Sequence, residues 1–126
     1  MNPRTRNRLL LPLTVALAAG ALAYVSLHRE EPVDFSTQVK PILNKHCLAC
    51  HGGVKKQGGF SLLFREEALG KTKSGKPAIV PGDPDHSEFI TRLTHADPEE
   101  WMPYREAPLP NDEIELLRKW VEQGAE

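Results

Sequence analysis

The sequence predicts an all-α fold, because two segments repeat apolar residues at helical spacing and no segment alternates apolar and polar residues as a strand would. The first helical segment covers residues 34–46. Asp34 is a suitable N-cap, and Pro41 removes a backbone donor, so we expect this helix to kink or to start late. Its apolar stripe is formed at three- and four-residue spacing by Phe35, Val39, Ile42, Leu43 and His46.

The second helical segment lies near the end of the chain, over residues 112–123. Asn111 can cap its amino end, and Gly124 can terminate it. A shorter helix is expected over residues 88–94, with Ser87 as its cap. The two longer helices should cross and bury their apolar faces against each other. The residues expected in this contact are Phe35, Val39, Leu43, Leu117, Trp120 and Val121.

Residues 1–31 are predicted to be an N-terminal membrane anchor or signal segment with a short polar linker. Arg4, Arg6 and Arg8 precede a charge-free run at residues 9–27, and positive charge before an apolar run is typical of export or membrane insertion. As a helix this run is about 28 Å long, close to the hydrocarbon thickness of a bilayer. A retained single span is favoured, and the alternatives are cleavage at the Ala-Leu-Ala of residues 21–23 or a buried soluble helix. Either of the first two places residues 32–126, one domain, outside the cytoplasm.

Length, charge and cysteine content exclude several classes of protein. The chain has 126 residues, enough for one ordinary domain after the N-terminal segment. Its 16 basic and 17 acidic residues give a net charge of −1, without the basic surplus of a nucleic-acid binder. Two cysteines exclude a disulfide framework. The charge is segregated, because residues 32–76 hold eight basic and three acidic residues, whereas residues 77–126 hold four basic and 12 acidic.

The most specific motif is Cys47-Leu48-Ala49-Cys50-His51. Two thiols three residues apart at the end of a helix can reach both vinyl groups of one haem, and the next histidine then ligates the iron. Attachment of haem c takes place outside the cytoplasm, which suits an exported chain. We therefore predict one haem c, covalent through Cys47 and Cys50, with His51 as an iron ligand. The alternatives are a CxxC redox pair, a strained disulfide, or a zinc site completed by His46, His86 or His95.

The predicted sixth ligand of the haem iron is Met102. The other methionine is the initiator, so Met102 supplies the remaining thioether of the chain. It precedes Pro103, which favours an extended backbone at the residue before it and suits a side chain laid across a ring. His86 and His95 are rival distal ligands, although we expect both to face solvent. An open iron face and an ordinary core methionine are further alternatives.

Other segments accompany the haem motif in chain order: Val33-Asp34-Phe35, Val39-Lys40-Pro41-Ile42-Leu43, Gly58-Gly59-Phe60-Ser61-Leu62, Ile79-Val80-Pro81-Gly82-Asp83-Pro84, Met102-Pro103 and Glu113-Ile114. With them, residues 33–126 resemble the small monohaem domains called planctomycete-type cytochrome c. The resemblance implies an all-α cytochrome c fold around one covalently bound haem, with His/Met ligation of its iron. The chain departs from the family at Tyr104, where another proline is expected.

These features predict a monohaem c-type cytochrome that moves single electrons on the periplasmic side of the inner membrane, as a tethered carrier or a subunit of a redox complex. No residue set suggests a nucleophile, an acid–base pair or an oxyanion site, so we do not expect an enzyme. A haem-based sensor and a structural or assembly subunit are the alternatives. The expected partners are redox proteins, and the membrane through residues 9–27. Seven lysines either steer an acidic partner or form a solvated surface: Lys40, Lys45, Lys55, Lys56, Lys71, Lys73 and Lys76.

Overall fold

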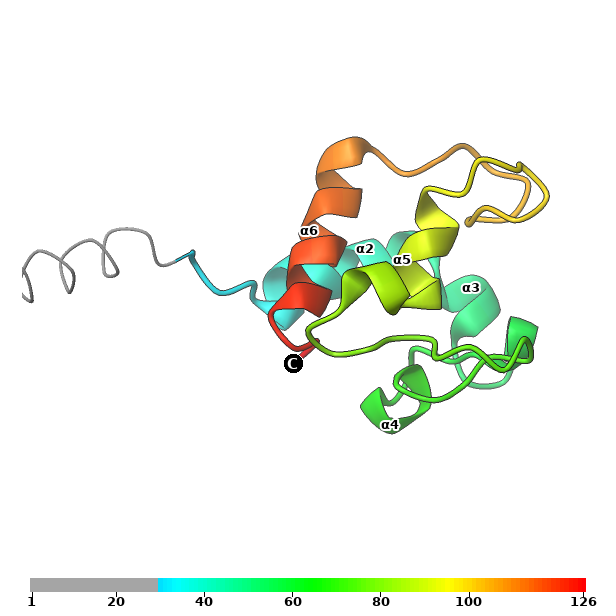
Figure 1. Ribbon diagram of the computed structural model, residues 1–126, viewed down its shortest axis with the longest axis horizontal. Helices are drawn as coiled ribbons and strands as arrows, with labels where there is room; N and C mark the ends of the chain where they lie inside the picture. Colours follow the sequence, from blue (N-terminus) through cyan, green and yellow to red (C-terminus); the bar gives the residue numbers. More distant parts are fainter. Residues whose placement is uncertain (1–29) are drawn as a thin grey trace, which may run out of the picture. The chain divides into compact units, whose positions relative to one another are not determined.

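Residues 30–126 are described by a computed structural model, and within them the ordered elements are helices (Figure 1). No strand forms in this range, where an isolated bridge pairs Lys71 with Pro77. The all-α prediction is therefore confirmed for the described residues. Pro32–Glu126 form one compact unit.

The predicted membrane segment, residues 9–27, lies outside the described residues. Of the helices that are described, none is long and apolar enough to cross a bilayer. The described elements follow one another as η1 (Phe35–Val39), α2 (Lys40–His46), α3 (Leu48–His51), η2 (Gln57–Gly59), α4 (Arg65–Ala68), η3 (Pro84–His86), α5 (Glu88–Leu93) and α6 (Asn111–Glu122).

The first predicted helix is present, but its first turns are wider than those of an α-helix. Asp34 caps it as expected, because its Oδ1 accepts from the backbone N–H of Thr37 at 2.7 Å. The π-helix η1 then closes with the N–H of Lys40 donating to the carbonyl of Phe35. Pro41 follows in the first turn of α2, where its missing N–H costs no helical hydrogen bond. The α-helix therefore starts late, as Pro41 predicts, and a π-helix occupies the residues before it.

The carboxy-terminal helix α6 matches the predicted span to within one residue at each end, but its predicted cap is wrong. Pro110 occupies the N-cap position, and Asn111 is the first helical residue with no side-chain capping bond. Proline has a fixed φ suited to the entry of a helix, so the turn needs no polar cap. The other end closes as expected, since Gly124 adopts a φ of +109° and its N–H donates to Val121.

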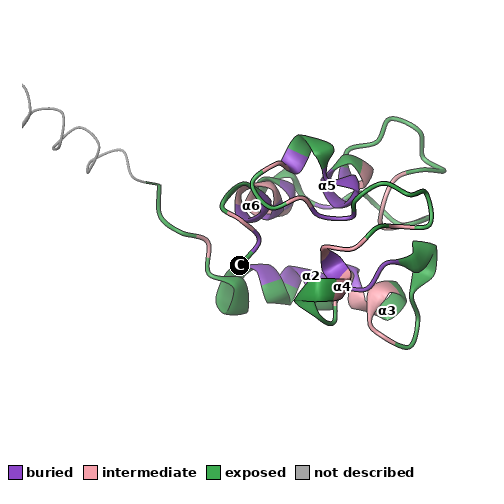
Figure 2. Ribbon diagram, turned by 60° about the horizontal axis from the view of Figure 1, so that its bottom comes forward, coloured by how far each residue is buried: buried purple, intermediate pink, exposed green. Residues whose placement is uncertain are grey.

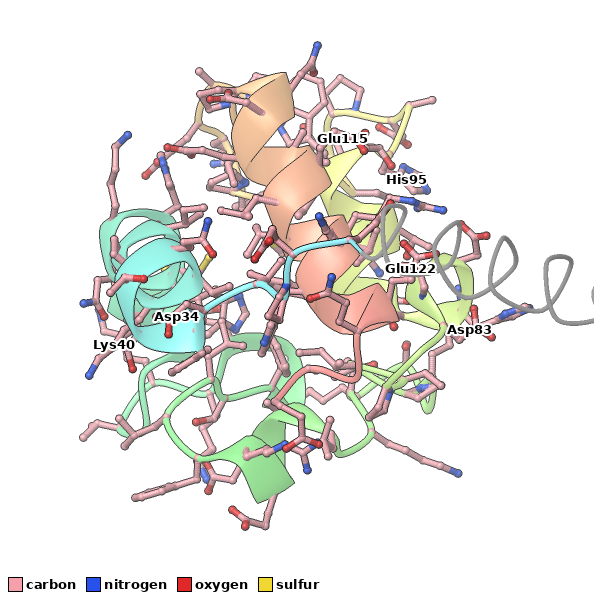
Figure 3. All side chains as sticks on the ribbon, turned by 90° about the vertical axis from the view of Figure 1, so that its left-hand side faces the viewer. Asp34, Lys40, Asp83, His95, Glu115 and Glu122 are labelled. Atoms are coloured by element: carbon pink, nitrogen blue, oxygen red, sulfur yellow. The ribbon has the colours of Figure 1, made fainter. Side chains whose placement is uncertain are left out.

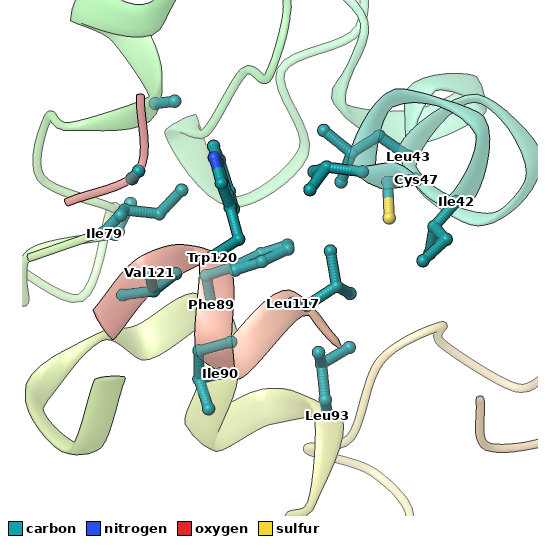
Figure 4. Packing of buried hydrophobic residues seen from close by; sticks show 14 of the residues in the cluster. Ile42, Leu43, Cys47, Ile79, Phe89, Ile90, Leu93, Leu117, Trp120 and Val121 are labelled. Carbon is teal, nitrogen blue, oxygen red and sulfur yellow. The ribbon is translucent and has the colours of Figure 1, made fainter. Parts of the chain in front are cut away.

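The core lies where α6 packs on η1 and α5 (Figure 2 and Figure 4). Leu117 and Val121 of α6 have no exposed surface, and Val39 of η1 is equally buried. Phe35, which we expected in this contact, is instead 36% exposed at its edge, with its ring centroid 5.7 Å from that of Trp120. The wide first turn places Phe35 at the margin of the core. The remaining labelled core residues come from α2, from Cys47 directly after it, from α5 and from the loop before α5.

The Pro-Gly-Asp-Pro segment, residues 81–84, forms a tight turn shortly before α5 begins. Ser87 occupies the N-cap position as predicted, but its hydroxyl does not cap the helix. Instead its Oγ donates to the carbonyl of Asp83 and accepts from the N–H of Val80, both at 2.8 Å. The carboxylate of Asp83 accepts from the N–H of His86 at 3.2 Å. The segment therefore folds back on itself and fixes where α5 begins.

Replacing Leu117 by alanine tests this packing. We expect Leu117→Ala to lower the free energy of unfolding by about 2–5 kcal/mol, because it leaves a cavity in the fully buried face of α6. The exposed neighbour Glu115→Ala should change it by no more than about 0.5 kcal/mol. Urea unfolding of the mature protein, followed by circular dichroism, measures both. Equal midpoints for the two variants would show that α6 does not form the core in this register.

Candidate haem site

The three residues of the haem motif share one helical turn at the end of α2. The N–H of Cys47 donates to Leu43 at 2.9 Å, and the carbonyl of Cys47 accepts from Cys50 at 3.2 Å and His51 at 2.9 Å. Side chains three and four residues apart lie on the same side of a helix. The turn therefore presents both sulfur atoms and the His51 imidazole to one region.

The two thiols occupy different environments. Cys47 is buried and belongs to the hydrophobic core, with its sulfur on the side of Ile42 and Leu117 (Figure 4), whereas Cys50 is exposed. Burial raises the pKa of the Cys47 thiol to about 12, and the nearby charge of Glu113 adds to this shift. Redox-active CxxC pairs need a lowered thiol pKa. The environment of Cys47 is therefore the opposite of the one that a dithiol redox centre requires.

The zinc alternative also finds no support. Across residues 30–126 no three His, Cys, Asp or Glu side chains are arranged to hold a metal ion. His46 approaches Glu113, with Nε2 and Oε2 2.9 Å apart. His86 pairs with Asp83 and is exposed, and His95 is exposed as well (Figure 3). Both exposed histidines therefore lie as expected.

His51 is oriented by a backbone carbonyl. Its Nδ1 lies 3.3 Å from the carbonyl oxygen of Phe60, and the two rings are 5.1 Å apart between centroids. A carbonyl oxygen can only accept, so this hydrogen bond requires the proton on Nδ1 and leaves the lone pair on Nε2. The carbonyl of His51 in turn accepts from Leu62 at 2.7 Å. The imidazole is thereby held in the tautomer that binds iron through Nε2.

The sharp turn after His51 depends on glycine. A Cβ at Gly52 would lie 2.3 Å from the carbonyl oxygen of Leu48, which no side chain can tolerate. Gly53 follows with a φ of +79°, in the left-handed region. These residues end α3 and start the loop that brings Phe60 back to the imidazole.

Met102 lies in the loop between α5 and α6, half-buried against the hydrophobic core that also contains Cys47. Its N–H donates to the carbonyl of Arg92 at 2.8 Å. The Arg92 guanidinium also binds the carbonyl of Glu100 at 3.1 Å and pairs with Glu88. In two views this loop and α3 lie at the same end of the domain (Figure 1 and Figure 2). Ligation of iron by Met102 stays a prediction.

The residues present fit a haem. One thiol is in the apolar interior and one is on the surface, as a ring with a buried and an exposed edge requires. The Nε2 of His51 is left as a ligand atom by its bond to Phe60. The indole Nε1 of Trp101, beside Met102, is buried and has no hydrogen-bond partner within the described polypeptide. A buried donor without an acceptor is expected where a further polar group belongs.

Sequence reasoning missed three contributors to this site. The carbonyl of Phe60 accepts from His51. Trp101 places a buried indole N–H beside Met102, and the charge of Glu113 raises the pKa of Cys47. Phe60 stood within a segment carried by the family resemblance, but no spacing rule links a carbonyl to an imidazole nine residues away. Neither Trp101 nor Glu113 carries a local signal for the site.

Comparison with known proteins agrees with this site. Residues 47–106 match the planctomycete cytochrome C family. This match begins at Cys47 and includes Met102. No curated protein and no solved structure matches the chain. Residues 47–106 are therefore similar to a planctomycete-type cytochrome c domain, a family that implies covalent haem c.

Proposed function

We propose that the protein is a monohaem c-type cytochrome that transfers single electrons on the periplasmic side of the inner membrane. The family supports the coarser statement of a haem-based redox role. One observation carries the proposal: Cys47, Cys50 and His51 share a turn, and the Phe60 carbonyl leaves Nε2 of His51 as the ligand atom.

The chain's own residues have distinct roles in this proposal. Cys47 and Cys50 form the two thioethers, and His51 and Met102 ligate the iron. The iron, when bound, supplies a one-electron couple whose potential is raised by a methionine ligand and by burial. Apolar residues around Cys47 exclude water from one side of the site. The carbonyl of Arg92 accepts from the N–H of Met102, so the backbone from which the thioether would reach the iron is held in place.

An electron carrier rather than an enzyme is supported by how the buried hydroxyl groups are used. Ser87 is fully buried, and its hydroxyl bonds to backbone atoms of Val80 and Asp83. Ser61 is nearly as buried, and its hydroxyl accepts from the N–H of Leu63 at 3.3 Å. The Ser87 hydroxyl therefore holds a turn, and the carboxylate that the Ser61 hydroxyl also contacts, Glu67, is itself paired with Lys56 and has a lowered pKa, which makes it a weak base. The proposal therefore gives the protein no catalytic residue.

We place the domain outside the cytoplasm, tethered by residues 9–27 or assembled with a redox complex. Three arginines before this apolar run support a cytoplasmic amino terminus. Thioether formation outside the cytoplasm requires the same orientation.

The proposed partner is an acidic redox protein that approaches the loops after the haem motif. Lys73 is exposed, and its N–H donates to Gly58 at 2.7 Å, so it lies beside the segment that carries Lys55. Lys56 pairs with Glu67, and Lys76 pairs with Glu88. Lys40 is the first residue of α2, so that helix separates it in sequence from the segment that carries Lys55. Acidic residues are concentrated in another part of the chain, since residues 77–126 hold 12 acidic and four basic residues. A basic loop region on a domain with acidic helices orients an incoming anionic surface.

A redox titration of the mature protein tests the electron-transfer role and the sixth ligand together. The wild type should titrate reversibly with one electron. Met102→Leu keeps the side-chain volume but removes the sulfur, so its ferric-to-ferrous ratio at a fixed solution potential should rise at least about tenfold, equivalent to about 59 mV. Its ferrous form should bind carbon monoxide. His86→Ala and His95→Ala are the controls and should change neither property.

Two outcomes would contradict this assignment. The first is an unchanged Met102→Leu variant together with a changed histidine variant, which would make the histidine the ligand. The second is rapid binding of carbon monoxide by the ferrous wild type at neutral pH, which would favour the sensor.

Charge reversal tests the docking region. Lys73→Glu should slow oxidation of the ferrous protein by ferricyanide several-fold at low ionic strength, because the anionic probe loses its attraction. The difference should vanish near 1 M salt, where the screening length is about 3 Å. Lys40→Glu changes the net charge equally and serves as the control, with a smaller effect expected. Equal slowing by both variants in stopped-flow measurements would show that net charge, and not this region, steers the reaction.

A further inference from the structure

The loop that carries Met102, between α5 and α6, is exposed along its first half (Figure 1). Residues 94–100 are all exposed, and burial begins at Trp101 and Met102, which are half-buried. A segment with little buried apolar surface opens locally at a small cost in free energy. The position of Met102 therefore depends on the polar contacts that attach this loop to the helices.

Arg92 of α5 makes three hydrogen bonds to this loop. Its carbonyl accepts from the N–H of Met102 at 2.8 Å. Its Nη1 donates to the carbonyl of Glu100 at 3.1 Å and pairs with the Glu100 carboxylate as well. The main chain and the side chain of one residue thus bind the loop at Met102 and two residues before it.

The other side of the Arg92 guanidinium is fixed within α5. Its Nε donates to Oε1 of Glu88 at 2.9 Å, and its Nη2 lies 2.8 Å from the same oxygen. Glu88 is buried, and its Oε2 lies 3.6 Å from Nζ of Lys76. A planar guanidinium that is bound twice by a buried carboxylate has a fixed orientation. This pairing therefore directs Nη1 at the loop.

The hydrogen bonds inside the loop hold its shape but do not attach it to a helix. The carbonyl of Asp97 accepts from the N–H groups of Glu100 and Trp101 at 3.0 and 3.1 Å. The carboxylate of Asp97 accepts from the N–H of Glu99 at 3.0 Å. The turn of residues 97–101 can therefore move as one piece, and the contacts with Arg92 are what oppose that movement.

We propose that Arg92 is a positioning residue for the sixth ligand: by binding Glu100 it holds the loop in place and sets how often Met102 leaves the iron. This inference rests on the proposed function, since it requires ligation by Met102. Each opening is a ligand exchange, in which the thioether sulfur departs with its lone pair and no electron is transferred.

Cyanide binding by the ferric mature protein measures this opening. Cyanide can bind only after Met102 has left, so its binding rate at saturating cyanide equals the opening rate. Glu100→Gln removes the loop carboxylate and leaves the buried pair of Arg92 with Glu88 intact, so this rate should rise about two- to fivefold. Arg92→Lys should raise it further, because an ammonium group lacks the planar fork that binds Glu88 and Glu100 together.

The matched control is Glu99→Gln, which removes an equal charge from the same loop. Glu99 is exposed, and its carboxylate accepts from the hydroxyl of Tyr104 at 3.2 Å, within the loop. This variant should bind cyanide at the wild-type rate. A second readout, hydrogen exchange of the Met102 amide, does not depend on the chemistry of the iron. Its protection should fall about two- to fivefold in Glu100→Gln, while that of Leu117 in α6 stays unchanged.

Four outcomes would overturn the proposal. They are an unchanged cyanide rate and Met102 protection in Glu100→Gln, an equal change in Glu99→Gln, an equal loss of protection at Leu117, and a wild-type cyanide rate that does not saturate. The third would show that the effect is global. Failure of the proposed function is separate, because it would appear as a wild type without a thioether haem spectrum. Protection of the Met102 amide would still test the attachment by Arg92 in that case.

Discussion

The hydrogen bond between Nδ1 of His51 and the carbonyl of Phe60 is the constraint on which the rest of the site depends. It fixes the tautomer and the plane of the imidazole, and therefore which nitrogen remains for a metal. Gly52 allows the chain to turn immediately after the histidine, and Leu62 returns a backbone N–H to the His51 carbonyl. The loop after the motif is thus the support for the ligand, although it carries no ligand atom itself.

Contacts at both ends of α6 join this helix to the rest of the domain. Glu113 of α6 approaches His46 at 2.9 Å and Lys45 at 3.5 Å, which joins the last helix to the turn that carries Cys47. At the other end of α6, the Arg65 side chain binds the carbonyls of Gly124 and Ala125 at 3.2 and 3.1 Å. A small domain held at both ends of its longest helix can present its motif on a rigid base. Rigidity suits electron transfer, because less reorganisation accompanies a change of charge.

The sequence was most informative where chemistry or periodicity is local. The spacing of Cys47, Cys50 and His51 indicates the motif, and the apolar stripe of α6 indicates a helix within one residue of its observed bounds. The cap at Asn111 was wrong, because Pro110 already sets the entry geometry. The four-residue helix α4 was not predicted, since one turn is too short to show a period.

The contributions that were missed depend on long-range placement. Phe35 shares the apolar stripe of the first helix, yet the π-turn moves it to the edge of the core. The Phe60 carbonyl and the Trp101 indole are common groups whose role comes only from their surroundings. Ligation by Met102 was inferred by elimination among thioethers, and the structure adds that its backbone is fixed by Arg92.

The most direct test of the central claim is the mass of the mature protein and of its peptide over residues 47–51. We expect the mass of the polypeptide plus one haem, retained after acid extraction and located on the peptide that contains Cys47 and Cys50. Two free thiols that both accept an alkylating reagent, with no added mass, would contradict it.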